Sequence, residues 1–217
     1  MKFRDRVQAG NILAERLSAS PTLISRDRSQ SIVLGIPRGG VIIADIVARK
    51  LSTDFDVAMG RKLGAPENPE LAIGAIMEDG TTYLNEYLIK ALKLSDDYLE
   101  REKSKQLAVI KYRTAIYPKS REYILKDKIV ILTDDGIATG ATIIAAARWI
   151  KKHGPNYLII AVPVALPQTV EILRQEADAI DVILSPEALN SVGQFYENFE
   201  PITDDKVSKI LTSAAHF

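Results

Sequence analysis

An uninterrupted apolar run that ends in two aspartates constrains the fold more than any other segment. Residues 128–133 read Lys-Ile-Val-Ile-Leu-Thr, and Asp134 and Asp135 follow directly. A run without polar alternation is typical of a strand buried on both faces of a parallel sheet. In open α/β sheets, ligands bind at the carboxyl ends of such strands. We therefore expect a strand at 128–133 with both carboxylates at its functional end.

A loop of small residues follows the two acids and leads into a predicted helix over residues 142–152. The loop reads Gly-Ile-Ala-Thr-Gly-Ala across residues 136–141, and Gly140 lets a ligand approach the backbone closely. The first N–H groups of a helix have no partner within it, and the helix dipole adds positive potential, so the site suits a dianion. The amides concerned are those of Ala141, Thr142 and Ile143.

The acids and the loop together indicate a phosphorylated sugar as the ligand. Asp134 and Asp135 would repel a bound anion unless a neutral or cationic group lay between them. A sugar with two hydroxyls and a distant phosphate meets this condition, because its hydroxyls donate to the carboxylates while the phosphate reaches the loop. Thr139 and Thr142 add hydroxyl donors. A capped helix beside two solvated acids is the alternative interpretation.

Strands alternate with helices along most of the chain, which predicts an α/β fold with a mostly parallel, twisted sheet flanked by helices. The predicted strands lie at residues 31–36, 56–59, 71–77, 81–84, 128–133, 158–164 and 180–184. Predicted helices reach Ser18, cover residues 41–51, 142–152 and 169–176, and follow Asp205. We expect one domain over residues 1–217, with a Rossmann-like core at about 20–185 and a small C-terminal hood at about 186–217, with or without the N-terminal helix.

Composition excludes several classes of function. Lys plus Arg and Asp plus Glu both number 28, so no broad basic field is present to bind nucleic acid. The chain has no cysteine, which excludes disulfides, thiolate catalysis and Cys-ligated zinc. Its two histidines are His153, which we interpret as the end of a helix, and His216 near the C-terminus. A charged N-terminus and the lack of a long apolar run predict a cytoplasmic protein with no membrane partner.

Three segments together resemble the type I phosphoribosyltransferase family. Residues 129–142 are similar to its motif for 5-phosphoribosyl 1-diphosphate (PRPP), a strand, two acids and a Thr-Gly-x-Thr phosphate loop. Residues 35–40, Gly-Ile-Pro-Arg-Gly-Gly, resemble its pyrophosphate loop, in which paired glycines expose N–H groups and Arg38 adds a forked cation. Residues 57–62 resemble the strand and Arg-Lys pair of its orotate and adenine branches. Taken together, the sequences of these motifs most resemble those of a poorly characterised bacterial and archaeal branch of the family.

The resemblance implies an enzyme that binds PRPP and Mg²⁺ and transfers phosphoribosyl to a nitrogenous base or similar small acceptor, with release of pyrophosphate. It implies catalytic roles for Arg38, Lys62, Asp134 and Asp135, and contact of the two aspartates with the metal ion. The implied PRPP-binding residues are Arg38, Gly39, Gly40, Arg61, Lys62, Asp134, Asp135, Gly136, Ala138, Thr139, Gly140, Ala141 and Thr142. It also implies a strained or cis peptide between Pro37 and Arg38.

Two further segments carry features of the family. Residues 189–197 resemble the hood of the 6-oxopurine branch, and the implied acceptor-binding residues are Asn190, Val192, Phe195 and Tyr196. That branch has an acid where this chain has Ala138, so we expect weak turnover with hypoxanthine and guanine. The charged stretch from Asn85 to Lys126 predicts one or two exposed helices, with a mobile end near Tyr117-Pro118, where the family carries a lid.

Other interpretations of these motifs remain. A regulator that binds PRPP with little or no catalysis would use the same contacts, although the neutral charge balance disfavours one that binds nucleic acid. A receiver domain also has an acid pair after an apolar strand, but only 217 − 134 = 83 residues follow Asp134, too few for such a domain. The acceptor, the pathway and the oligomeric state, a homo-oligomer included, stay open.

Overall fold

A five-stranded parallel sheet forms the centre of the computed structural model, which describes residues 2–117 and 124–214. The strands run in the order β2-β1-β6-β7-β8. They are β1 (Ser31–Gly35), β2 (Asp54–Val57), β6 (Ile129–Thr133), β7 (Tyr157–Val164) and β8 (Ala179–Leu184). Every residue of β1 and β6 is buried, as expected for strands covered on both faces.

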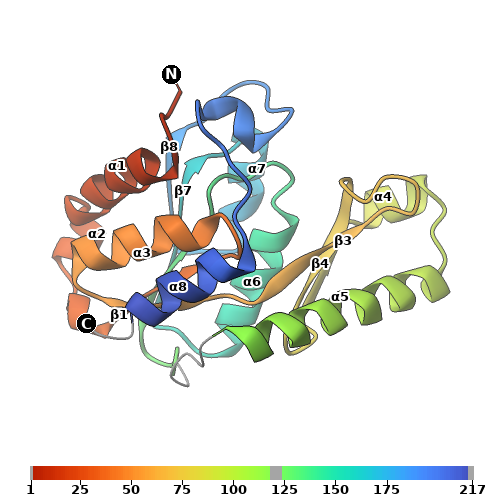
Figure 1. The fold of residues 1–217 in the computed structure, drawn as a ribbon, viewed down its shortest axis with the longest axis horizontal. Coiled ribbons are helices and arrows are strands. Elements are labelled where there is room, and N and C mark those ends of the chain that lie inside the picture. Colours follow the sequence, from red (N-terminus) through yellow and green to blue (C-terminus); the bar gives the residue numbers. More distant parts are fainter. Residues whose placement is uncertain (1, 118–123, 215–217) are drawn as a thin grey trace.

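The two faces of the sheet are covered by different helices (Figure 1). Side chains alternate along β6, so Ile129 and Ile131 pack with α1 (Arg6–Ser18) and α3 (Gly40–Leu51) on one face. Val130 and Leu132 face the other side, in one apolar cluster with α6 and α7. These two helices are α6 (Ala141–Lys152) and α7 (Pro167–Leu173). The sheet is thereby buried in a three-layer core.

A second unit of the fold projects from this body as an arm (Figure 1). Its three-stranded antiparallel sheet has the order β3-β4-β5. The strands are β3 (Gly60–Gly64), β4 (Ala72–Met77) and β5 (Thr82–Leu84), and they are followed by α4 (Glu86–Ala91) and the long α5 (Asp96–Ile116). α5 packs against β3 and β4, and α3 and α8 (Asp204–Ala214) extend the same apolar cluster. The arm therefore shares its core with the C-terminal helix.

The remaining elements are short. They are α2 (Pro21–Ile24) and the 3₁₀ turns η1 (Arg28–Gln30) and η2 (Val192–Phe195). Phe3 near the N-terminus forms a parallel bridge with Tyr196, and their rings lie 5.4 Å apart. The N-terminal segment and residues 192–199 are thus packed together beside the edge of the central sheet.

The α/β fold and its parallel sheet are confirmed, with two corrections. β3 was not predicted from the sequence; Arg61 and Lys62 lie inside this strand because its backbone pairs with β4, a long-range contact that the local pattern does not encode. The helices of the charged stretch are present, but α5 is not wholly solvated, because Glu102, Gln106 and Arg113 are buried. Glu102 and Gln106 bond to residues of β3, and Arg113 pairs with Asp204 of α8. The peptide between Pro37 and Arg38 is cis.

Residues 118–123, which include most of the expected mobile end, lie outside the described residues. His153 ends α6 as expected, and its Nδ1 lies 2.8 Å from the Trp149 carbonyl oxygen. Within residues 2–117 and 124–214, no helix is both long enough and apolar enough to cross a membrane.

Candidate functional site

The candidate site lies where the strand order of the central sheet reverses. β1 is followed in sequence by β2 on one side, while β6 pairs with β1 on the other, and Gly35 at the end of β1 is the register partner of Thr133 at the end of β6. Such a switch point leaves a crevice at the carboxyl ends of the two strands. The loops that leave β1 and β6 carry the two motifs identified in the sequence.

The glycine loop after β1 packs directly on the two aspartates. A Cβ atom at Gly40 would lie 2.8 Å from the Cα atom of Asp134, and one at Gly39 would overlap the carboxylate of Asp135. Both positions therefore require glycine because backbone and carboxylate approach so closely. The sequence motifs at 35–40 and 129–142 form one structure rather than two independent loops.

Asp134 faces the cleft with a carboxylate that protein atoms largely surround. Its Oδ1 accepts a hydrogen bond of 2.8 Å from the backbone N–H of Asp135. Burial raises the pKa of Asp134 well above its ordinary value, and the adjacent charge of Asp135 raises it further. A ligand that donates hydrogen bonds to this carboxylate, or a nearby cation, would favour its ionised form.

Asp135 points instead into a buried ion pair. Arg6 Nε at the start of α1 lies 2.7 Å from Asp135 Oδ2, and only 8% and 13% of the two side chains are exposed. Burial raises the pKa of Asp135, and the Arg6 charge opposes that shift. Tyr196 donates a hydrogen bond of 2.6 Å from its hydroxyl to the Asp135 carbonyl oxygen. The second acid is therefore fixed by both ends of the chain.

The loop after the two acids presents a helix N-terminus to the crevice. Gly140 has a φ of +78°, in the left-handed region that favours glycine, and α6 begins at the next residue. Thr169 of α7 donates a hydrogen bond of 3.1 Å to the Ala138 carbonyl oxygen and so holds the loop in place. Thr139 is exposed and Thr142 half-buried, so a phosphate can reach both hydroxyls.

The basic pair reaches the site from β3. Arg61 Nε donates a hydrogen bond of 3.0 Å to Gln106 Oε1 of α5. The pKa of Arg61 is lowered, and burial is the largest cause of this shift. Lys62 Nζ lies 2.6 Å from the exposed carboxylate of Glu70. Such a surface ion pair is weak, so Lys62 can exchange Glu70 for a ligand at little cost.

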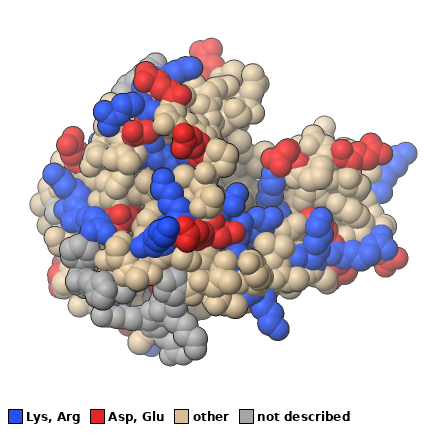
Figure 2. Space-filling model, in the orientation of Figure 1, with Lys and Arg blue, Asp and Glu red and all other residues tan. Residues whose placement is uncertain are grey.

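These elements enclose a cleft of about 190 Å³. It is lined by Ile36, Pro37, Gly60, Arg61, Lys62, Asp134 and Thr142. All three sequence motifs contribute to this lining, although they are far apart in the chain. Figure 2 shows the molecule hollowed between the body and the arm, with Lys and Arg side chains near the base of the hollow.

The family model for the phosphoribosyl transferase domain matches residues 7–194, most of the chain and every element of the cleft. This chain belongs to the phosphoribosyltransferase family. A Mycobacterium tuberculosis (strain H37Rv) protein, provisionally named phosphoribosyl transferase Rv0571c, is 38% identical over 213 residues, which cover 98% of this chain and 47% of that protein. The chain thus spans about half the length of the curated relatives it matches.

Solved structures share the fold of this chain. The crystal structure of TT1426 from Thermus thermophilus is 39% identical, with a TM-score of 0.76, and the match covers 98% of this chain and 99% of that one. The hypoxanthine-guanine phosphoribosyl transferase of L. donovani has a TM-score of 0.50 at 11% identity, with 86% of this chain and 85% of that chain covered. At that identity the likeness shows a shared fold.

The four residues expected at the hood of this member of the family lie in different surroundings. Val192 covers Gly136, where an added Cβ would lie 2.5 Å from its Cγ1 atom. Asn190 is exposed, and Phe195 is half-buried against the N-terminal segment. Tyr196 is only 4% exposed and packs on Phe3, so its hydroxyl serves the Asp135 loop. Asn190 is the exposed residue of this set, and the acceptor-binding role of all four residues stays a prediction.

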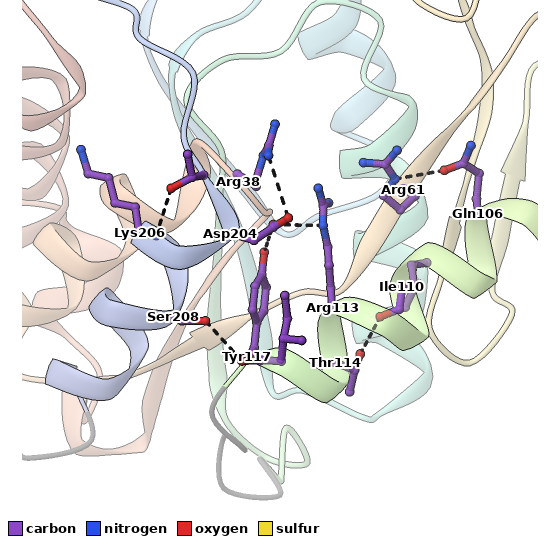
Figure 3. Close-up of polar contacts among 12 residues, drawn as sticks. Arg38, Arg61, Gln106, Ile110, Arg113, Thr114, Tyr117, Asp204, Lys206 and Ser208 are labelled. Atoms are coloured by element: carbon purple, nitrogen blue, oxygen red, sulfur yellow. Dashed lines mark hydrogen bonds and ion pairs between the residues drawn. The ribbon is translucent and has the colours of Figure 1, made fainter.

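Three charged residues near the site were not recognised in the sequence. Arg6 holds Asp135, while Arg113 of α5 and Asp204 of α8 lie beside Arg38 and Arg61 (Figure 3). No local pattern marks them, because each acts on a residue far away in the chain. Arg113 is identified by its burial, which is unusual for an arginine. This burial can be seen in the structure and not in the sequence.

The donor set at the cleft fits a magnesium ion that arrives with phosphate ligands. Among the described residues, no group of three acidic or histidine side chains is arranged to hold a metal. Mg²⁺ commonly keeps several waters and binds one or two carboxylates together with substrate phosphates, so such a cage is not required. Asp134 is the residue that would hold the ion here, since Asp135 Oδ2 is already bound to Arg6.

Proposed function

We propose that this chain binds PRPP and Mg²⁺ in the cleft and transfers the phosphoribosyl group to a nitrogenous acceptor, with release of pyrophosphate. One observation carries the proposal above all others. The cleft is lined together by the glycine loop, the Arg61-Lys62 pair, Asp134 and Thr142 of the phosphate loop. A molecule with a phosphate at one end, hydroxyls in the middle and a diphosphate at the other end matches this order of groups.

Each end of PRPP has a counterpart in the cleft. The 5-phosphate binds at the N-terminus of α6, where Gly140 exposes backbone amides and Thr139 and Thr142 add hydroxyls. The ribose hydroxyls donate to Asp134, whose raised pKa then falls toward its ordinary value. Asp135 supports this site through its backbone and through its pair with Arg6.

The diphosphate binds at the opposite side, between the loop after β1 and β3. Arg38 and the amides of Gly39 and Gly40 approach it from the body, and Arg61 and Lys62 approach it from the arm. Mg²⁺ at the diphosphate supplies further positive charge when it is bound. The protein therefore concentrates positive charge where the leaving group carries its negative charge.

The reaction breaks the bond between ribose C1 and the diphosphate oxygen, whose electron pair leaves with the diphosphate. A nitrogen lone pair of the acceptor forms the new bond to C1, and the acceptor releases its proton to solvent. The residues of this chain contribute by holding both reactants in line and by stabilising the departing charge. No side chain in the cleft needs to form a covalent intermediate.

We further propose that the acceptor is not a 6-oxopurine. The position at which the purine branch carries an acid is Ala138 here, and its carbonyl oxygen is occupied by the Thr169 hydroxyl. Without a carboxylate at that position, proton transfer at a purine ring nitrogen loses a contribution of about 10²–10⁴ in rate. The hood, where Asn190 is exposed and Val192 is half-buried over Gly136, is where such an acceptor would be recognised.

A screen for pyrophosphate release tests the enzyme proposal. The purified protein is incubated with PRPP and Mg²⁺ and with each member of a panel of purines, pyrimidines and small nitrogen heterocycles. We expect release that depends on one acceptor class, with hypoxanthine and guanine among the poorest. Tight PRPP binding without release for any acceptor would favour the regulatory alternative, and efficient hypoxanthine turnover would refute the acceptor proposal.

A further inference from the structure

Three arginines from three separate elements converge beside the cleft (Figure 3). Arg38 comes from the loop after β1, Arg61 from β3, and Arg113 from the last turn of α5. Burial is the largest cause of the lowered pKa of Arg61, and the charges of Arg113 and Arg38 lower it further. Neighbouring positive charges repel one another, so negative charge among these three arginines stabilises the cluster.

Asp204, the first residue of α8, supplies a negative charge between Arg38 and Arg113 (Figure 3). Its Oδ1 lies 3.1 Å from Arg113 Nε and accepts a hydrogen bond of 2.7 Å from the Tyr117 hydroxyl. Its Oδ2 lies 4.0 Å from Arg38 Nη1. A single carboxylate therefore bridges the body, the arm and the C-terminal helix.

Glu102 is the other acid that acts on Arg61, but its carboxylate is already engaged. Oε1 accepts a hydrogen bond of 2.8 Å from Gln106 Nε2, and Oε2 lies 3.4 Å from Lys105 Nζ. Asp204 is therefore the acid that joins Arg113 to Arg38. Even with Asp204 and Glu102 both counted, the three positive charges of the arginines outnumber the two negative charges, which favours the binding of a further anion.

The cluster continues the cleft on the side where the proposed diphosphate lies. Arg61 and Pro37 line the cleft, and Arg38 directly follows Pro37. Arg113 is held in place because only 9% of its side chain is exposed, whereas Asp204 and Arg38 keep 27% and 40%. The buried arginine is thus the fixed part of the cluster, and the acid and Arg38 are the parts that can exchange partners.

We propose that Arg113 is a third arginine of the diphosphate site, and that Asp204 is an internal substitute for the diphosphate that the ligand displaces. This inference rests on the proposed function. A diphosphate carries more negative charge than one carboxylate and can meet Arg38 and Arg113 together. Until it binds, Asp204 keeps the cluster neutral enough to stay ordered and competes with the ligand for the same guanidinium groups.

The inference predicts opposite effects for the two partners of one ion pair. Asp204→Asn removes the competing charge but keeps an oxygen that accepts from Tyr117, so affinity for inorganic pyrophosphate should rise about threefold or more. Arg113→Gln removes a charge-assisted hydrogen bond, so the affinity should fall about tenfold or more. A pair with a purely structural role would weaken binding in both variants.

The experiment is a calorimetric titration of inorganic pyrophosphate, with Mg²⁺ and at fixed ionic strength, into the unmodified protein and each variant. Ribose 5-phosphate is titrated in parallel and should bind all variants with similar affinity, because it has no diphosphate. Lys111→Gln is the matched control, since it removes a positive charge from the exposed face of the same helix. Its pyrophosphate affinity should equal that of the unmodified protein.

The outcomes separate the two proposals. An unmodified protein that binds neither PRPP nor pyrophosphate would refute the proposed function, and with it this inference. If the unmodified protein binds PRPP normally, two results would refute the inference alone. One is a pyrophosphate affinity that Arg113→Gln leaves unchanged, and the other is a pyrophosphate affinity that Asp204→Asn lowers. Should Arg113→Gln fail to fold, Arg113→Lys keeps the positive charge and should retain most of the affinity, and the rise expected for Asp204→Asn still decides.

Discussion

Arg6 Nε and Asp135 Oδ2 lie 2.7 Å apart in a pair that joins the first residue of α1 to the second acid of the phosphate-binding motif. Arg6 also donates a hydrogen bond of 2.9 Å to the Glu200 carbonyl oxygen, and its guanidinium lies 3.7 Å from the centre of the Phe199 ring. One arginine thereby links the N-terminal segment, the C-terminal segment and the site. The carboxylate that it holds would otherwise be a largely buried, unpaired charge.

Replacement of Arg6 by Gln should therefore destabilise the fold strongly. Removing one partner of a buried ion pair costs about 3–5 kcal/mol, because the other charge stays buried without compensation. Urea denaturation of the unmodified protein and of Arg6→Gln measures this difference. Arg4→Gln is the control, since Arg4 pairs with Asp5 at the surface and should change stability by less than about 1 kcal/mol. Equal losses in the two variants would contradict the account.

The pH dependence of stability should report on Asp134. Its folded-state pKa is raised above the ordinary value of 3.8, so the folded protein is most favoured below that value and loses stability as the pH rises through the raised pKa. Asp134→Asn removes this penalty and keeps an oxygen for the backbone N–H of Asp135. We expect the variant to melt at a higher temperature than the unmodified protein at pH 7.

The gain should shrink as the pH is lowered toward 3.8, where both states of the unmodified protein bind the proton. Thermal unfolding of the two proteins over a series of pH values tests this. A gain in melting temperature that does not change with pH would show that the charge of Asp134 is not its cause.

Alanine substitution at two glycines with positive φ can distinguish the cost of backbone strain from a loss of ligand binding. Gly140 has a φ of +78° in the phosphate loop, and Gly80 has a φ of +86° in the turn of the arm. Alanine at either position should cost about 1–2 kcal/mol, because a Cβ disfavours the left-handed region. At Gly140 the Cβ would also lie 2.9 Å from Thr169 Cγ2 and displace the loop.

Only Gly140→Ala should weaken the binding of ribose 5-phosphate, whereas Gly80→Ala should bind it as the unmodified protein does. Denaturant unfolding measures the free energy of unfolding of both variants, and calorimetry measures their affinity for ribose 5-phosphate. Equal affinity for ribose 5-phosphate in the two variants would remove the α6 N-terminus from the proposed phosphate site.

Local pattern was sufficient to predict the strands of the central sheet, the two acids and the phosphate loop, whereas the other two motifs of the cleft were identified from their resemblance to the family. The apolar run at residues 128–133 and the glycines at 39 and 40 are signals that a short window contains. β3 escaped prediction because its strand character comes from pairing with β4 rather than from its own residues. The roles of Arg6, Arg113 and Asp204 also escaped, since each lies in a different element from the residue that it pairs with.

The separation of the two adjacent aspartates shows the same limit of sequence reasoning. The motif predicts that Asp134 and Asp135 act together on the ribose, yet the strand end turns one toward the cleft and the other toward Arg6. Successive side chains on an extended backbone point in opposite directions, and only the position of α1 decides what the second one meets.

Calorimetric titration of PRPP with Mg²⁺ into the unmodified protein and Asp134→Asn tests the central claim most directly. The account predicts saturable binding to the unmodified protein with one site per chain. It predicts that affinity falls about tenfold or more in the variant, because hydrogen bonds from the ribose to a charged acceptor are lost. Equal PRPP affinity in two folded proteins, or no PRPP binding to the unmodified protein, would contradict it.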